Sequence, residues 1–342
     1  MTITEYVITN IESTPLFDNR YSQLRCINID ITGMKERQGV FSVIFEANDT
    51  ILNEHVILKI YDPAKMTEPY RQLCFDRESE ILKTLLNKNR CLQLKSALKD
   101  TTIQLNMNNS DIQLPLKYFV TEFLPISIIE SFYNKNNASV IEKLELFKDI
   151  VLSIRALHSH EVYHRDLKPD NIRAYLENLK RIVVAIDLGT AVKEDFPQLL
   201  LEYGSSVGAR GYSAPEAFVG FACERKMCFL TDFYAIGCML FELFNQDFFF
   251  VRMNKENYFV LLTYLRNIVQ ATPVRKRREV WDELVQKHSH QIHYPKFSEF
   301  GFDIPIVIQD YLTSILNGLV DFNYRTRLAN VGGNLIPPAG SW

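Results

Sequence analysis

The chain has 342 residues, of which 47% are hydrophobic and 23% are charged, and its formal net charge is −3. This length and apolar content are enough for one large globular domain or two medium ones. The nearly balanced charge excludes the strongly basic overall field that marks many proteins that bind nucleic acids or anionic membranes. We therefore expect a globular chain that binds no nucleic acid.

Neither the start of the chain nor its cysteines indicate secretion. The first residues, MTITEYVITN, lack a basic start followed by an apolar core, and the six cysteines show no CxxC pair or framework spacing. The longest apolar stretch, at 233–244, is shorter than the ~20 residues of a membrane span and carries Glu242, so it predicts a buried helix. We expect a cytoplasmic protein without a membrane span, with export by a leaderless route as the open alternative.

The first third of the chain has the pattern of a small, mostly β lobe. Residues 1–24 precede it, and we expect them to form an extension that packs on this lobe. From 25 to 124, short β-rich runs such as FSVIFEA, HVILKIY and KYFVTEF surround one helical segment, RQLCFDRESEILKTLL. The polar segment NMNNSDIQ, at 106–113, is typical of an exposed turn between two strands.

Helical periodicity dominates residues 125–330, which follow the short crossover FLPIS. Ser139 and Glu142 form a capping box that opens a helix. The predicted apolar stripe of this helix consists of Ile141, Leu144, Phe147, Val151, Ile154 and Leu157. Residues 331–342 are predicted to form a C-terminal tail. Two lobes joined by a short crossover predict a shared cleft, where ligands tend to bind.

A dense charged motif, HRDLKPDN at 164–171, lies between a predicted helix and two predicted strands. Phosphoryl transfer requires a placed hydroxyl nucleophile, Mg²⁺ held against phosphates, and compensation of charge on the transferred group. Asp166 can orient the hydroxyl and accept its proton, and Lys168 can lie near the γ-phosphate. Asn171 and Asp187 can present oxygen ligands to hard metal ions. The alternative, a solvated charged turn, is disfavoured by the motifs elsewhere in the chain.

The HRDLKPDN motif and the DLG at 187–189 resemble the signature of eukaryotic-type protein kinases, whose other motifs follow in order from about 25 to 328. The resemblance implies an α+β, bilobal kinase fold with one helix in the small lobe. It implies ATP and Mg²⁺, or Mn²⁺, as cofactors. It also implies that Lys59, at the end of VILK, binds the α- and β-phosphates and that Glu78 is its ion-pair partner.

The same resemblance places adenine between the lobes. Thr121 matches the gatekeeper position of the family. Glu122 to Leu124 match the hinge, which hydrogen-bonds adenine through its backbone.

Anchoring residues of the larger lobe also match. The APE motif at 214–216 and Asp232 in TDFYAIG correspond to the anchors of the activation segment and of the central helix. Arg325, in DFNYRTR, lies where the family places the partner of the APE glutamate. We therefore expect Glu216 and Arg325 to form a buried ion pair with a structural role.

The phosphate-covering loop departs from the family pattern. Instead of GxGxxGxV it reads RQGVFSVI, which keeps only Gly39 and has Arg37, Ser42 and Ile44 at the other positions. Gly33 becomes the first glycine if the loop carries an insertion. Fewer glycines restrict the approach of backbone to phosphate, so we expect a stiffened but usable loop.

Three further positions depart from the family pattern, two of them at the adenine site. Ile57 replaces an alanine and narrows the pocket, and Leu188 mildly replaces the phenylalanine of DFG. Arg173 stands where an apolar residue forms the floor. Its guanidinium either stacks beneath the purine or turns outward to a carboxylate while Ile172 or Tyr175 supplies the floor. Strand alternation favours the outward orientation.

The segment between DLG and APE contains Ser205 and Ser206. Arg165 is the family's receptor for a phosphate there, so either serine is a candidate switch, although loops are commonly rich in serine. By resemblance Lys168 favours serine or threonine substrates. Ala209 weakens that assignment, because serine/threonine kinases usually carry a threonine there that bridges the catalytic aspartate and lysine.

Two other clusters have ordinary explanations. HSHQIH, at 288–293, could bind zinc but lacks further ligands at a suitable spacing, which favours an exposed polar stretch. RKRRE, at 275–279, could be a docking patch, but a solvated helix start is the favoured interpretation.

We predict an ATP- and Mg²⁺-dependent serine/threonine protein kinase that phosphorylates protein hydroxyls with Asp166 as the base. The alternative is a pseudokinase that binds nucleotide or partners without phosphoryl transfer, as suggested by the irregular loop, Arg173 and Ala209. A kinase of small molecules is disfavoured by the APE motif and Asp232. Nothing in the pattern indicates an oligomeric state.

Overall fold

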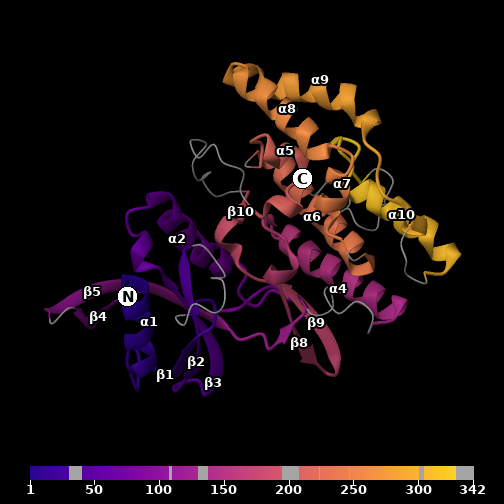
Figure 1. The fold of residues 1–342 in the computed structure, drawn as a ribbon. Coiled ribbons are helices and arrows are strands. Elements are labelled where there is room, and N and C mark those ends of the chain that lie inside the picture. The colour runs from indigo at the N-terminus through magenta and orange to yellow at the C-terminus, as the bar shows by residue number, and fades with distance from the viewer. Residues whose placement is uncertain are drawn as a thin grey trace. The chain divides into compact units, whose positions relative to one another are not determined.

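The computed structural model describes residues 1–30, 41–107, 110–129, 138–194, 208–222, 224–245, 247–299 and 304–328. The chain forms two compact units, Met1–Leu124 and Pro125–Trp342. The first is built on an antiparallel sheet and the second mainly on helices (Figure 1). This combination confirms the predicted α+β class and is consistent with the bilobal kinase fold.

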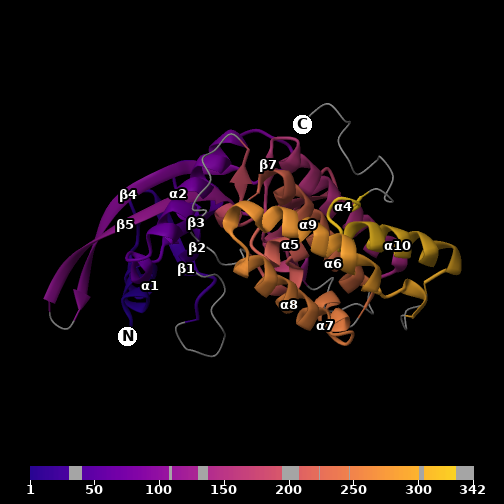
Figure 2. The same ribbon diagram turned by 90° about the horizontal axis from the view of Figure 1, so that it is seen from above.

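The sheet of the first unit has five antiparallel strands in the order β1-β2-β3-β5-β4. These strands are β1 (Tyr21–Cys26), β2 (Ser42–Asp49), β3 (Glu54–Tyr61), β4 (Leu94–Met107) and β5 (Ser110–Glu122). β4 and β5 form a long hairpin whose pairing continues to Met107 and Ser110 (Figure 2). The strands therefore run through most of the segment 106–113, where the sequence predicted a turn.

Helices cover the sheet on both faces, and strand alternation decides which residues meet which helix. Helix α2 (Pro69–Thr84) corresponds to the predicted helical segment and follows the short helix η1 (Pro63–Lys65). The Phe75 ring of α2 packs 5.0 Å from the ring of Phe119 in β5. The neighbouring residues of β5, Tyr118 and Val120, point to the other face and belong to a different apolar cluster. Burial on both faces explains the nearly continuous apolar sequence of β3.

That second face is covered by α1 (Ile3–Ser13), a helix that the sequence reading did not assign (Figure 1). Thr2 and Glu5 form a capping box at its start. Val7, Ile8 and Ile11 are buried at helical spacing against β1 and β4. The N-terminal segment is thus part of the core of the first unit.

The second unit contains a three-stranded sheet, a two-stranded pair and short turns. The sheet, in the order β6-β8-β9, comprises β6 (Ile126–Ser127), β8 (Ile172–Glu177) and β9 (Lys180–Ala185). The pair consists of β7 (Val162–Tyr163) and β10 (Val192–Lys193). Three short helices are interspersed with these strands along the chain or follow them: η3 (Pro169–Asn171), η4 (Leu188–Thr190) and η5 (Arg210–Tyr212).

Helices make up the rest of the second unit (Figure 1). They are α4 (Val140–His158), α5 (Pro215–Phe218), α6 (Arg225–Phe244), α7 (Phe249–Asn254), α8 (Tyr258–Ala271), α9 (Arg277–His288) and α10 (Ile306–Leu319). Short helices η6 (Val274–Lys276), η7 (Ser289–Gln291) and η8 (Phe297–Glu299) connect or flank them. α6 is central, because it contacts α4, α5, α7 and α10.

The capping box of α4 is present, but its buried face differs from the predicted stripe. Ser139 and Glu142 cap each other's backbone as predicted. Ile141, however, is 68% exposed, while Leu146 and Ile150 are buried. At about 100° per residue, Ile141 lies about 120° around the helix from Phe147, so the predicted stripe drifts off the packed face.

Part of α6, Met227–Phe244, is long and apolar enough to cross a membrane, because the helix begins before the apolar stretch at 233–244 that the sequence indicated. It is 94% buried inside the protein, as in the core helix of a globular unit. Gly237 packs so closely on α10 that an added Cβ would lie 2.5 Å from a methyl carbon of Val320. Length and composition are therefore weak evidence for a membrane span here.

Candidate functional site

The first unit contains a buried ion pair between Lys59 in β3 and Glu78 in α2. The Lys59 ammonium lies 2.9 Å and 2.7 Å from the two oxygens of Glu78. Strand alternation turns Lys59 toward the α2 face, because its neighbours Leu58 and Ile60 belong to the cluster under α1. The ion pair that the resemblance implied is present.

Ser42 and Ile44, assigned by sequence to the phosphate-covering loop, lie in β2 and are braced by Asn28. The Asn28 amide donates to the carbonyl of Ser42 (3.0 Å) and accepts from the N–H of Ile44 (2.8 Å). Sequence reasoning missed Asn28, for which no motif gave a signal. Arg37, Gly39 and Gly33 lie outside the described residues.

The predicted adenine-binding segment, 122–124, is hydrogen-bonded to Gln93, which directly precedes β4. The Glu122 N–H donates to the Gln93 carbonyl (2.9 Å), and the Gln93 N–H donates to the Glu122 carboxylate (2.8 Å). Burial raises the pKa of Glu122. Among the described residues, Leu124 makes no backbone–backbone hydrogen bond.

Thr121 and Ile57 face each other in the sheet. They are register partners in the pairing of β3 with β5. Thr121 is buried, and Ile57 is half-buried. Their side chains share the face of the sheet that carries Lys59, because residues two apart in a strand point the same way.

In the second unit, Asp232 of α6 anchors the 164–171 loop. Its fully buried carboxylate accepts hydrogen bonds from the N–H groups of His164 (2.8 Å) and Arg165 (2.7 Å). The His158 ring nitrogen Nε2 lies 2.8 Å from the same carboxylate. Arg165 has a φ of 66°, so the anchor holds a non-glycine residue in the left-handed region. This strain is consistent with a loop fixed for function.

The 164–171 loop brings Asp166, Lys168 and Asn171 together. The Asn171 amide donates to the Asp166 carbonyl (2.8 Å) and lies 3.3 Å from its carboxylate oxygen Oδ2. The Lys168 ammonium is 3.8 Å from the same oxygen. Burial raises the pKa of Asp166, and the positive charge of Lys168 opposes this effect. A half-buried carboxylate beside a lysine can accept a proton from a hydroxyl placed next to it.

Asn171 and Asp187 lie at the same end of the β8–β9 hairpin. The register pairs Ile172 with Ala185, and the Ile186 N–H donates to the Asn171 carbonyl (2.8 Å). Asp187 itself has a left-handed backbone, with φ 61°. One carboxylate and one amide oxygen are ligands of the kind that Mg²⁺ takes, alongside phosphate and water oxygens.

His, Cys, Asp and Glu side chains form no group of three suited to a metal within the described part of the chain. In the segment HSHQIH, the His288 ring lies 3.0 Å from the Gln291 side chain. A cation at Asn171 and Asp187 therefore needs ligand oxygens from phosphate or water, as Mg²⁺ sites in phosphoryl-transfer enzymes usually do.

Arg173 lies in β8, opposite Ser127 of β6 and Val184 of β9. Its side chain is half-buried, and burial lowers its pKa. The negative charge of Asp170 opposes this lowering, although no ion pair of Arg173 is found among the described residues. Ile172 is fully buried.

The guanidinium of Arg165 donates hydrogen bonds to backbone carbonyls. Its Nε donates to the carbonyl of Thr190 (2.8 Å), and its Nη1 donates to that of Ala222 (3.3 Å). These bonds connect the start of the DLG-to-APE segment with the region after APE. Ser205 and Ser206, the candidate switch residues, lie outside the described residues.

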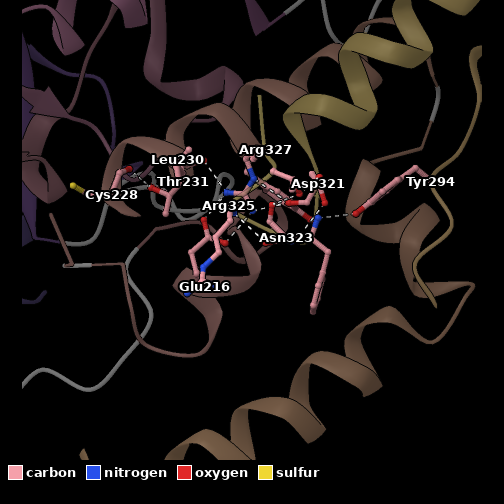
Figure 3. A network of polar contacts seen from close by, with 12 residues as sticks. Glu216, Cys228, Leu230, Thr231, Tyr294, Asp321, Asn323, Arg325 and Arg327 are labelled. Carbon is pink, nitrogen blue, oxygen red and sulfur yellow. Dashed lines mark hydrogen bonds and ion pairs between the residues drawn. The ribbon is translucent and has the colours of Figure 1, made fainter. Parts of the chain in front are cut away.

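The predicted pairing of Glu216 with Arg325 is wrong, because the partner is Arg327 (Figure 3). Both side chains of the Glu216–Arg327 pair are completely buried, with N–O distances of 2.5 Å and 3.0 Å. Arg325 is exposed and pairs with Asp282 of α9. The chain turns at Asn323, whose carbonyl accepts from the Arg327 N–H (3.0 Å), and this turn directs Arg327 inward.

The basic segment RKRRE begins α9, as the favoured interpretation predicted. Arg277 donates from Nε to the carbonyl of Thr272 (3.0 Å) and thus ties the helix start to the end of α8. Arg278 forms ion pairs with Glu224 and Asp282. These two arginines have structural partners.

Comparison with known proteins gives one consistent result. The model of the protein kinase domain matches residues 37–331. A probable cell division protein kinase of Encephalitozoon cuniculi is 26% identical over 87% of this chain and 92% of its own length. The serine/threonine-protein kinase prpf4B of Dictyostelium discoideum is 24% identical over 74% of this chain but 28% of its own length. Human cyclin-dependent kinase-like 2 is 29% identical over 55% of this chain and 38% of its own length.

Proposed function

We propose that this chain, which belongs to the protein kinase family, transfers the γ-phosphate of ATP to serine or threonine hydroxyls of proteins. The observation that carries this proposal is the arrangement of Asp166, Lys168 and Asn171 on a loop anchored by Asp232. The serine/threonine kinase names of relatives support the choice of acceptor. Lys168 supports it by resemblance.

Asp166 orients the acceptor hydroxyl and takes its proton as the oxygen attacks. Lys168, 3.8 Å from the Asp166 carboxylate, compensates charge on the transferred group. Asn171 and Asp187 hold the cation, for which their oxygens are suitable ligands. When bound, Mg²⁺·ATP supplies the phosphoryl group and a divalent charge that neutralises the phosphates.

Residues of the first unit bind the nucleotide in this proposal. Lys59, oriented by Glu78, contacts the α- and β-phosphates. The backbone at Glu122 and Leu124 hydrogen-bonds the base. The remaining assigned contacts are Gly39, Ser42, Ile44, Ile57, Thr121 and, from the second unit, Arg173.

A pseudokinase is the second candidate, because Arg173 is half-buried without an ion pair among the described residues. A buried cation at the position of the adenine floor disfavours a purine in that site unless the two stack. The retained Lys59, Asp166 and Asp187 favour the active enzyme, since each carries a separate task of phosphoryl transfer.

The test is transfer of labelled phosphate from ATP to generic protein substrates by the purified protein. Asp166→Asn should lower the transfer rate by about 10²–10⁴-fold, the usual contribution of a general base, while nucleotide binding persists. Asp187→Asn should remove the Mg²⁺ dependence of nucleotide binding. A wild-type protein that binds nucleotide but transfers no phosphate establishes the pseudokinase instead.

A further inference from the structure

The carboxylate of Asp166 is held by two different parts of the second unit. Oδ1 accepts a hydrogen bond of 2.6 Å from the backbone N–H of Ala209, just before the APE motif. Oδ2 lies 3.3 Å from the Asn171 amide, within the loop of Asp166 itself. The first contact joins residues 43 positions apart in the sequence. The orientation of Asp166 therefore depends on the segment that contains Ala209.

Gly208 permits this contact. Its φ of +92° lies in the region that favours glycine, and an added Cβ would lie 2.4 Å from the carbonyl oxygen of Arg165. The same Cβ would be 3.4 Å from the Asp166 carboxylate. Both the backbone conformation and the space exclude any other residue without a shift. The backbone at Gly208 thus lies directly against the loop of Asp166.

The carbonyl group of Ala209 also accepts hydrogen bonds. This carbonyl accepts from the Tyr212 N–H (2.9 Å) and from the Ser213 hydroxyl (3.3 Å). The Tyr212 hydroxyl in turn donates to Glu242 of α6 (2.7 Å). The central helix therefore anchors both ends of the arrangement, through Asp232 under the loop and through Glu242 under Tyr212.

The Asp166 side chain is 16% exposed. A small cavity, with about 10 Å³ of space for the centre of a water molecule, borders Asp166, Leu167 and Ala209. A cavity of this size holds one water at most. Ala209 has no polar side-chain group, so its backbone N–H is the donor that this residue offers to the carboxylate.

We propose that the peptide group between Gly208 and Ala209 is a positioning group, which holds the Asp166 carboxylate in the orientation that receives the acceptor hydroxyl. This inference rests on the proposed function, since it assigns a task to Asp166. The backbone N–H of Ala209 would then perform the role that a threonine side chain has at this position in the family. The base is then aligned only when the segment at 208–209 is docked on its loop.

Two glycines make a matched test. Gly208 and Gly220 both have positive φ, +92° and +108°, but a Cβ at Gly220 meets no atom within 4 Å. Gly208→Ala and Gly220→Ala therefore carry a similar backbone strain, and only the first pushes the segment off Asp166. We expect Gly208→Ala to lower kcat at least ten-fold with KM for ATP and for substrate within about three-fold, and Gly220→Ala to keep the kcat of wild type.

A second pair removes the donor itself. Ala209 has a φ of −69°, which proline adopts, so Ala209→Pro deletes the N–H without changing this angle. Ala209→Ser keeps the N–H and should be at least ten-fold more active than Ala209→Pro. Melting temperatures of all four variants, measured alongside, separate loss of positioning from loss of folded protein.

The outcomes decide between the two proposals. If wild type transfers phosphate and Gly208→Ala matches Gly220→Ala in kcat, the positioning role is overturned while the kinase function stands. A loss of activity in Gly208→Ala that appears in KM, or that follows the unfolded fraction, also overturns it. Absence of transfer by wild type overturns the function of Asp166 on which the inference rests.

Discussion

Two buried ion pairs among the described residues, Glu216–Arg327 and Lys59–Glu78, differ in how their cations are bound. In the second unit, Arg327 makes five hydrogen bonds, to Glu216, Leu230 and Asp321, and its guanidinium lies 5.3 Å from the centre of the Tyr234 ring (Figure 3). In the first unit, the Lys59 ammonium contacts the two oxygens of Glu78.

Chemistry explains the choice of cation in each place. A guanidinium offers five N–H donors in a rigid plane, which suits a permanent junction of several chain segments. An ammonium is a compact charge on a flexible stem, and it can keep a carboxylate partner while it turns toward a phosphate. We therefore expect the Arg327 pair to govern stability and the Lys59 pair to govern activity.

The largest effect is expected from Arg327→Ala. The change leaves the fully buried Glu216 without a partner, and such broken pairs cost about 3–5 kcal/mol. Denaturant unfolding should show this loss. Arg325→Ala is the control, because its exposed pair with Asp282 is screened by solvent and should contribute little to stability. Equal losses in the two variants would mean that burial of the pair has no bearing on stability.

Lys59→Met sharpens the comparison from the other side. Loss of the phosphate contact should lower transfer by about 10²–10³-fold, as removal of one preorganised donor typically does. The variant also leaves Glu78 unpaired, so some stability is lost. Adding Glu78→Gln should restore the melting temperature but not the activity. Recovery of transfer in the double variant would contradict the role of Lys59.

The carboxylate of Glu122 extends the comparison, because it accepts a hydrogen bond from a backbone N–H and forms no buried ion pair among the described residues. Burial raises its pKa in the folded protein above the unfolded value of about 4.3. Its favourable contribution is therefore present below that unfolded value and is lost as the pH rises through the folded pKa. Glu122→Gln, which stays neutral, should match wild type near pH 4 and melt at a higher temperature than wild type near pH 7.

Glu122→Gln retains the oxygen that accepts from the Gln93 N–H, so the hydrogen bond is preserved. Melting curves across this pH range check the result. A variant that becomes relatively less stable as the pH rises would show that the carboxylate is stabilised in its ionised form.

The smallest effect is expected from Arg173→Leu, which removes a half-buried cation without an ion pair among the described residues. Since burial disfavours this charge, the free energy of unfolding should rise slightly, by less than about 1 kcal/mol. Calorimetric titration with Mg²⁺·ATP should show less than a tenfold change in affinity. A larger loss, above about 1.4 kcal/mol, would indicate that the guanidinium stacks on the base.

Sequence reasoning succeeded where the chemistry is contained in a short segment. Asp166, Lys168 and Asn171 lie within six residues, and the structure brings these three together as the motif implied. The Lys59–Glu78 pair is also present, as the family resemblance implied. Both predictions rest on motifs that can be recognised along the chain.

Sequence reasoning failed where the path of the backbone decides which groups meet. Arg325 and Arg327 are two residues apart in an irregular turn, which has no periodicity to indicate which side chain points inward. Gly208 gave no signal either, because a positive φ and a contact with a distant carbonyl are invisible in the sequence. The misplaced ion pair and the unrecognised peptide group share this cause.

Helix α1 was missed for a different reason. Its capping box, Thr2 with Glu5, is the same signal that identified α4 through Ser139 and Glu142. The apolar spacing of Val7 and Ile11 was also readable. The family motifs begin after this segment and carry no information about it.

The position of α1 has a consequence for work with fragments of this protein. The family match begins at residue 37, so a recombinant fragment cut at that border would lack both α1 and β1. Such a fragment would present β2 as an uncovered edge strand and expose the apolar face that includes Phe45 and Leu58. Uncovered apolar edges pair with one another in solution. A shortened protein of this kind should aggregate during expression, and its lack of activity would say nothing about the catalytic residues.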